Sequence, residues 1–383
     1  MRYADSEKLP AHEEETVMEE LFHTRFCDLF SIRLPLVQAG MAGNITSPQM
    51  VAAVSEAGGL GTLGGAYMKP DALRQAIRQV KELTKKPFSV NLLISDEPPQ
   101  AAVSPELTDW INQMRAEVGL DAWSGEVPDY VNDLDECFSV ILDEKVPVFS
   151  VAFQLPGRYG QAAKQAGMKL IGMATTVAEA LALQAEGVDA VVAQGGEAGG
   201  HRGTFSVGPS GNGETVGMMA LLPLMADALP DTPVIAAGGI MDGRGVVAAL
   251  ALGADAVQLG TRFLACEESL AHRAYKEKLA QAKETEPQIT RAFSGRPARG
   301  LSNRLMETFA RQQLTSLPYP LQNSLTREIR NAAAKNNQAE YMSLWAGQGV
   351  PQLAKKGSET AGEIVESLFA EARQVLNRIG RLG

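Results

Sequence analysis

The sequence predicts an α/β protein, with a (β/α)8 TIM barrel as the leading architecture. Short runs rich in Val, Ile and Leu recur along the chain, and each is followed by a glycine-rich or polar turn and then by a helical pattern. The runs are continuously apolar and do not alternate with polar residues, which is typical of parallel strands covered on both faces. Eight such units favour a closed barrel, and a doubly wound parallel sheet is the alternative.

The order of elements follows from these runs and from helix-capping signals. Ser47 is expected to cap a helix that begins at Pro48, and a second helix is expected to begin at Thr175 or Thr176 and to end at Gly187. The expected strands cover residues 36–39, 60–63, 88–92, 147–152, 169–173, 190–194, 233–237 and 256–260.

The composition restricts the class of protein and of partner. The chain has 383 residues, is 45% hydrophobic and carries a formal net charge of −10. It is therefore long and apolar enough for a large core, and neither nucleic acid nor an anionic membrane is an expected partner. A small anionic ligand stays open, because local backbone dipoles can bind one.

Cysteine usage and the first residues predict a cytoplasmic protein. Cys27, Cys137 and Cys266 are far apart and form no CxxC pair, so a disulfide framework is not expected. The acidic start of the chain lacks the apolar stretch of a secretory signal, and no apolar run approaches the length of a membrane span. An oligomer remains compatible with this composition.

Two segments lie outside the alternation of strands and helices. Residues 95–135 are rich in proline and acidic residues and are interpreted as an insertion that forms a lid or an added helical layer. Residues 286–383 are expected to form a helical and loop segment that packs on the barrel. This leaves residues 1–25 as an N-terminal extension and residues 26–285 as the barrel.

The ends of the last two expected strands are candidates for a phosphate-binding site. Gly238 and Gly239 follow one strand, and Gly260 and Thr261 follow the next. Glycines let a phosphate approach the backbone N–H groups, and the Thr261 hydroxyl adds a donor. The alternative is that these glycines only form tight turns.

Two further strand ends suggest that a flat ring binds beside them. Ala39, Gly40 and Met41 end the first strand, where small residues would let a ring lie against the main chain under the soft side chain of Met41. Asn91, near the end of the third strand, offers an amide that matches the polar edge of a flavin. A tight loop and a satisfied structural amide are the alternatives.

The sixth strand ends in the sequence "QGGEAGGHRG", residues 194–203. Gln194 supplies a second amide, and Gly199 and Gly200 let the loop pass close to a planar ligand. His201 lies at the expected catalytic rim and can exchange a proton near neutral pH, so it is the candidate base. The alternative is a loop histidine bonded to a carbonyl. The other histidines are expected at the surface: His12, His23 and His272.

Several other chemistries find no support in the sequence. No His, Cys or carboxylate cluster has the spacing of metal ligands, so no metal is expected. There is also no GxSxG nucleophile elbow and no Walker loop.

Five segments together resemble the nitronate monooxygenase family. They are "QGGEAGGHRG", "VIAAGGIMDGRG", "ADAVQLGTRF", "PFSVNLLI" and "SLWAGQG", and the similarity runs from about residue 34 to about residue 349. The resemblance implies a TIM barrel that binds FMN non-covalently. It also implies oxidation of alkyl nitronates by dioxygen to carbonyl compounds and nitrite.

The resemblance also implies roles for individual residues. His201 matches the catalytic histidine of the family, and the Ala39–Met41 segment matches the residues that line the flavin. The chemistry of the reaction calls for positive charge near the nitro oxygens, for which protonated His201 and Arg202 are the candidates. Tyr341 and Trp345 are candidates for the pocket wall, and a core role is the alternative for Trp345. The FMN-binding motif positions are matched by Asn91, Gln194, Gly199, Gly239, Gln258, Leu259, Gly260 and Thr261.

Other functions remain open beside this one. Flavin-type enoyl-acyl carrier protein reductases have a closely similar glycine–histidine loop, and an NAD(P)H-dependent flavin reductase is a related alternative. A flavin-binding barrel without catalysis belongs to a different class. The "SLWAGQG" segment favours the nitronate enzyme over the reductase, and the histidine beside the glycines argues against a barrel without catalysis.

Overall fold

The computed structural model describes residues 21–95, 101–128, 133–208, 211–355 and 358–381. Its central strands are β1 (Leu36–Gln38), β2 (Gly61–Gly64), β3 (Phe88–Leu93), β4 (Val148–Ala152), β5 (Lys169–Ala174), β6 (Ala190–Gln194), β8 (Val234–Ala237) and β9 (Ala256–Leu259). They form one eight-stranded parallel sheet in the order β1-β9-β8-β6-β5-β4-β3-β2. A parallel bridge between Val37 and Leu60 brings the two edges together. The predicted barrel is confirmed, and the doubly wound sheet is wrong.

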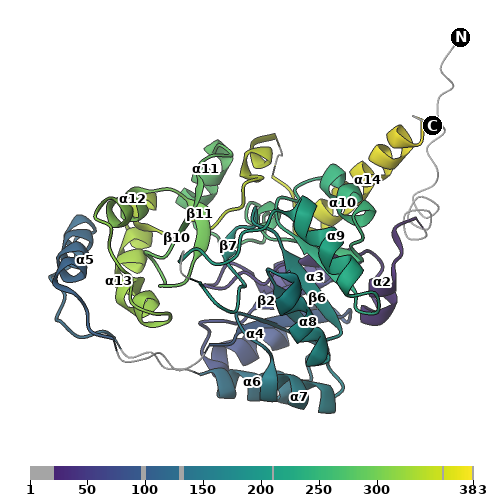
Figure 1. Cartoon of the computed structure of the whole chain (residues 1–383), viewed down its shortest axis with the longest axis horizontal. Helices are drawn as coiled ribbons and strands as arrows, with labels where there is room; N and C mark the ends of the chain where they lie inside the picture. Colours follow the sequence, from purple (N-terminus) through teal and green to yellow (C-terminus); the bar gives the residue numbers. More distant parts are fainter. Residues whose placement is uncertain (1–20, 96–100, 129–132, 209–210, 356–357, 382–383) are drawn as a thin grey trace, which may run out of the picture.

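Helices surround this sheet (Figure 1). They are α3 (Pro48–Glu56), α4 (Pro70–Leu83), α6 (Leu134–Asp143), α7 (Gly157–Gln165), α8 (Val177–Ala185), α9 (Met218–Ala228), α10 (Gly243–Ala251) and α14 (Ala361–Ile379). The Ser47 side chain accepts a hydrogen bond from Met50 N at 3.0 Å, and Thr176 accepts one from Glu179 N at 3.1 Å. Both expected caps are therefore confirmed. The C-terminal helix α14 packs against α10 and α3 on the outside of the barrel.

A short helix, α2 (Arg25–Phe30), closes the amino-terminal end of the barrel. Phe26 and Phe30 are buried in one apolar cluster with strand residues that include Val148 and Ile235. This plug leaves the carboxyl ends of the strands as the end of the barrel at which a ligand can enter.

A second helical layer lies beside the barrel. The insertion contributes α5 (Pro105–Glu117), which lies near α12 and α13 in Figure 1. Trp110 of α5 packs edge to face on Phe309 at 5.1 Å between ring centroids. The segment after β9 contributes η1 (Thr261–Phe263), α11 (Arg273–Gln281), β10 (Pro287–Thr290), β11 (Ala298–Leu301), α12 (Arg304–Arg311), α13 (Leu321–Lys335), η2 (Ala339–Tyr341) and η3 (Val350–Lys355). Between the two interpretations of the insertion, the structure favours an added helical layer.

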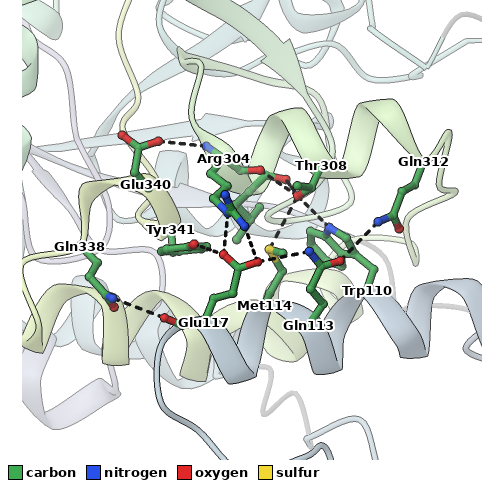
Figure 2. Close-up of polar contacts among 11 residues, drawn as sticks. Trp110, Gln113, Met114, Glu117, Arg304, Thr308, Gln312, Gln338, Glu340 and Tyr341 are labelled. Carbon is green, nitrogen blue, oxygen red and sulfur yellow. Dashed lines mark hydrogen bonds and ion pairs between the residues drawn. The ribbon is translucent and has the colours of Figure 1, made fainter.

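An ion pair fastens α5 to this layer, as Figure 2 shows. The Arg304 guanidinium donates to Glu117 Oε1 at 2.8 Å and lies 2.5 Å from Oε2, and the Tyr341 hydroxyl also contacts this carboxylate. The Arg304 contact is the main reason that the pKa of Glu117 falls to about 2. Tyr341, a candidate for the pocket wall, therefore binds the inserted helix instead.

The described part of the chain contains no helix that is both long enough and apolar enough to cross a membrane. The expected N-terminal extension lies almost wholly outside the described residues. The boundaries at residues 25 and 285 stay predictions.

Candidate functional site

A cavity of about 440 Å³ opens at the carboxyl ends of the barrel strands. Every cofactor-binding candidate lies on its wall, although they come from loops far apart in the sequence. These residues are Ala39, Gly40, Met41, Asn91, Gln194, Gly199, Gly200, Gly238, Gly239, Gln258, Leu259, Gly260 and Thr261. His201 lines the same cavity. The structure therefore brings the catalytic candidate and all the cofactor-binding candidates together.

Bare backbone forms one part of the wall. Gly239 has φ of 71°, a left-handed conformation that favours glycine. A Cβ atom at Gly199 would collide with the backbone nitrogen of Gly347, so this position also requires glycine. Gly347 N donates to Thr261 Oγ1 at 3.0 Å, which joins the "LWAGQG" segment to the end of β9.

Gly347 and Gly349 therefore belong to the wall as well, although they were not among the expected site residues. The glycine pair in "LWAGQG" was a local signal that could have identified them, because glycines marked the other loops of the site.

The amide of Gln194 holds the loop that carries His201. Its Nε2 donates to the His201 carbonyl oxygen at 2.9 Å, and its Oε1 accepts from Gly203 N at 2.8 Å. An amide nitrogen carries two protons, so one remains for a ligand. Asn91 Nδ2 donates to Ser150 Oγ at 2.9 Å.

Two buried hydroxyls on the cavity wall have no hydrogen-bond partner among the described residues. They belong to Thr62 on β2 and Ser89 on β3, which are paired in register. Buried polar atoms normally have a partner. A polar ligand or water in the cavity would supply one.

His201 lies on β7 (Gly200–His201), a short strand held by β11 through the pair Ala298 and His201. Its ring is flanked by Trp345 at 5.4 Å and Phe153 at 5.6 Å between centroids, so Trp345 does wall the pocket. Its Nε2 lies 2.8 Å from Ser294 Oγ. The alternative of a histidine bonded to a carbonyl through its ring therefore finds no support in these contacts.

Burial lowers the pKa of His201 to about 3, and the cations Arg296 and Arg330 lower it further in the same direction. The imidazole is therefore neutral at neutral pH, which leaves one ring nitrogen with a lone pair that can accept a proton.

The cation on the cavity wall is Arg330 of α13, and Arg202 is not among the described lining residues. Arg202 is fully buried, and its guanidinium donates to the carbonyl oxygens of Gln194, Gly195 and Glu214 at 2.9, 2.8 and 3.1 Å. It is therefore committed to holding the loop. The sequence pattern does not distinguish Arg330 from Arg327, the other arginine of α13.

Arg330 has unused hydrogen-bonding capacity. Its Nη2 donates to the carbonyl oxygen and to Oδ1 of Asn323 at 2.8 and 2.9 Å. Its buried Nε has no partner among the described residues. Burial lowers the pKa to about 10, so the group stays charged at neutral pH and can attract an anion.

The remaining histidines fall in different places. His23 is exposed and lies 2.8 Å from Asp28, as expected of a surface residue, whereas His12 lies outside the described residues. The surface expectation for His272 is wrong, because it lines the cavity and its Nδ1 caps α11 by accepting from Ala274 N at 3.2 Å. Among the described residues, no group of His, Cys, Asp or Glu is placed to hold a metal ion.

Comparison with known proteins assigns the chain to a protein family. The profile of the nitronate monooxygenase family matches residues 23–371. The chain belongs to the nitronate monooxygenase family. Members of this family are flavin-dependent oxidoreductases, so the chain is an enzyme of that class.

Individual relatives agree with the assignment to the nitronate monooxygenases. A probable nitronate monooxygenase from Bacillus subtilis (strain 168) is 43% identical over 340 residues, which cover 86% of this chain and 94% of that protein. A probable nitronate monooxygenase from Staphylococcus saprophyticus is 39% identical over 360 residues, which cover 93% of this chain and 99% of that protein.

Several solved structures share the barrel of this chain. Nitroalkane oxidase from Streptomyces ansochromogenes matches with a TM-score of 0.85 and 40% identity over 92% of this chain and 99% of that chain. FabK from Thermotoga maritima matches with a TM-score of 0.75 and 32% identity, over 94% of this chain and 99% of that chain. The enoyl reductase domain of MlnA from Bacillus amyloliquefaciens, at 13% identity and a TM-score of 0.64, shares the fold alone.

Proposed function

We propose that this enzyme binds FMN and oxidises alkyl nitronates with dioxygen, giving carbonyl compounds and nitrite. The observation that carries the proposal is one cavity with two unlike parts. Glycine backbone around Thr261 forms one part, and a neutral imidazole beside an arginine forms the other. The first part suits a phosphate, and the second suits proton transfer next to an anion.

The residues present fit FMN as the flavin. Backbone at Gly239, Gly260 and Thr261 offers the kind of cup that binds a phosphate at the last strands of a barrel. Gly347 closes this cup through its bond to Thr261, which suits a nucleotide that ends at its phosphate. The unpartnered hydroxyls of Thr62 and Ser89 are available for further polar atoms of the cofactor.

The bound flavin would accept electrons from the nitronate and pass them to dioxygen, which requires no metal. The chain's own task is to hold the substrate and to manage charge and protons. Arg330 is suited to attract the nitronate oxygens, because its Nε lacks a partner on the cavity wall. This residue takes the role expected of Arg202.

His201 would act as the base when the substrate is a neutral nitroalkane. It accepts the proton of the carbon next to the nitro group, and the electron pair of that C–H bond moves onto the nitro group to give the nitronate. Burial makes the imidazolium unfavourable, but the nitronate formed beside it is a counter-ion that offsets this cost.

The test combines spectroscopy and product analysis. The purified protein should have a flavin absorbance spectrum, release FMN on denaturation, bleach on anaerobic addition of a small nitronate, and release nitrite in air. His201→Asn should retain FMN and lose turnover of neutral nitroalkanes, while nitronates, which are already deprotonated, should lose much less. Equal losses on both substrates would show that His201 is not the base.

The same preparation separates the alternatives. Rapid anaerobic bleaching by NADH, with no nitrite from any nitronate, would support a reductase. A yellow protein that reacts with neither nitronate nor NADH would support binding without catalysis. A colourless protein that does not bind added FMN would contradict the cofactor and everything built on it.

A further inference from the structure

The hydroxyl of Ser294 is the polar partner of the His201 ring. Ser294 is 2% exposed and lies in the loop between β10 and β11, and its Oγ is 2.8 Å from His201 Nε2. Because β11 also pairs with β7, backbone hydrogen bonds hold the Ser294 loop and the His201 strand together. The distance between the two side chains is therefore set by backbone structure on both sides.

Counting protons at Ser294 decides which ring nitrogen carries the imidazole proton. Ser294 Oγ lies 3.1 Å from the Arg296 carbonyl oxygen and 3.3 Å from Arg296 N. The carbonyl can only accept and the N–H can only donate, whereas the hydroxyl has a single proton to give. If that proton goes to the carbonyl, Oγ accepts from Arg296 N and from Nε2–H of His201, and all groups are satisfied.

The opposite assignment leaves a group without its partner. If Ser294 donated its proton to Nε2, the Arg296 carbonyl oxygen would lose the Ser294 donor. The hydrogen bond lost in that arrangement is worth about 0.5–1.5 kcal/mol. The first assignment is therefore the more stable one.

We propose that Ser294 is a positioning residue that holds His201 in the tautomer with the proton on Nε2, so that Nδ1 is the atom that accepts the substrate proton. This inference rests on the proposed role of His201 as a base. In the transfer, the substrate C–H bond breaks, an N–H bond forms at Nδ1, and the electron pair stays on the substrate as the nitronate. Nε2–H donates to Ser294 before and after the step. A third group that fixes the tautomer of a catalytic histidine can be worth several powers of ten in rate.

The aromatic neighbours support the same arrangement. Phe153 and Trp345 lie on His201 with ring planes inclined at 65° and 56°, so they restrict rotation of the imidazole about its bond to the chain. Ser294 then selects the tautomer while these rings restrict the orientation.

The tautomer can be measured without turnover. The chain has four histidines, so the flavin-loaded protein with isotope-labelled histidine nitrogens should give few ring signals in NMR, and His201→Asn identifies those of His201. We expect a protonated Nε2 and an unprotonated Nδ1. A protonated Nδ1 in the native protein would overturn the inference, even if His201→Asn shows that the histidine is the base.

Variants extend the test to the reaction. Ser294→Ala should give a mixture of tautomers and lower kcat for neutral nitroalkanes by about tenfold or more, with a much smaller loss on nitronates. Ser294→Thr keeps a hydroxyl and should restore the Nε2–H signal and most of the rate. The exposed Ser302, which follows β11, provides the control Ser302→Ala, which should change neither the tautomer nor the rate. An unchanged tautomer in Ser294→Ala would overturn the positioning role.

Discussion

The Oγ1 atom of Thr261 accepts a hydrogen bond of 3.0 Å from the backbone nitrogen of Gly347. Thr261 follows the last barrel strand, whereas Gly347 lies in the segment that returns from the second helical layer. The contact therefore ties that segment to the candidate phosphate cup. It explains how residues outside the alternating strands and helices of the barrel take part in the site.

Replacing Thr261 tests this link. Thr261→Ala removes the hydroxyl, so we expect FMN affinity to fall by roughly three- to tenfold, the worth of one ordinary hydrogen bond. Fluorescence titration of the flavin-free protein with FMN measures the change. Thr261→Ser keeps the hydroxyl and should bind nearly as the native protein does. An unchanged affinity in Thr261→Ala would remove Thr261 from the cup.

A substitution at Gly199 tests the close approach of the two segments. Gly199→Ala places a methyl group against the backbone of Gly347, so the segment must shift. Overpacking of this kind costs about 1–3 kcal/mol, and flavin content should fall with stability. Gly362→Ala is the control, because the nearest atom to its new Cβ would be 3.8 Å away. Thermal unfolding and flavin absorbance measure both effects, and equal behaviour of the two variants would contradict the prediction.

The barrel and much of the site could be predicted because their signals are local. Continuously apolar runs identified the strands, and parallel strands place their carboxyl ends together. Candidates such as Asn91 and Gly239 could therefore be assigned to one cavity before their contacts were known.

Ser294 and Arg330 had no such local signal, unlike the missed glycines Gly347 and Gly349. Ser294 and Arg330 lie in the segment after β9, and only tertiary packing brings them to His201. Arg202 was a candidate because it follows His201 in sequence. Its guanidinium instead lies buried in the loop, where it donates to the carbonyl oxygens of Gln194, Gly195 and Glu214.

Arg330 should determine the affinity for nitronates. Arg330→Met removes the charge but keeps much of the side-chain length, so KM for a small nitronate should rise by roughly 10- to 100-fold, the worth of a hydrogen bond to a charged group. Arg327→Met, an exposed arginine of the same helix, is the matched control and should have little effect. Steady-state kinetics with nitrite detection measures both. If the two variants have the same KM, Arg330 does not bind the anion.

The neutral state of His201 predicts a dependence of stability on pH. The pKa of His201 is about 3 in the folded protein and 6.5 for an ordinary histidine. Between these values the unfolded chain binds a proton that the folded protein does not, so this histidine lowers stability as the pH falls from 6.5 toward 3. On acidification, the flavin-free protein should therefore lose more Tm than His201→Asn does. Parallel losses in Tm between about pH 7.5 and about pH 5 would show that the histidine is not held neutral.

The ion pair of Glu117 and Arg304 should stabilise the attachment of α5. Its contribution is present above the ordinary pKa of 4.5 and is lost as the pH falls toward 2, where Glu117 becomes protonated in the folded protein. The Arg304 side chain is 54% exposed, so solvent screening limits the effect of Glu117→Gln to about 1 kcal/mol. Urea unfolding at neutral pH measures it, with Asp109→Asn on the exposed side of the same helix as the control. The difference between the native protein and Glu117→Gln should shrink as the pH is lowered, and a difference that does not depend on pH would mean that packing, and not charge, holds α5.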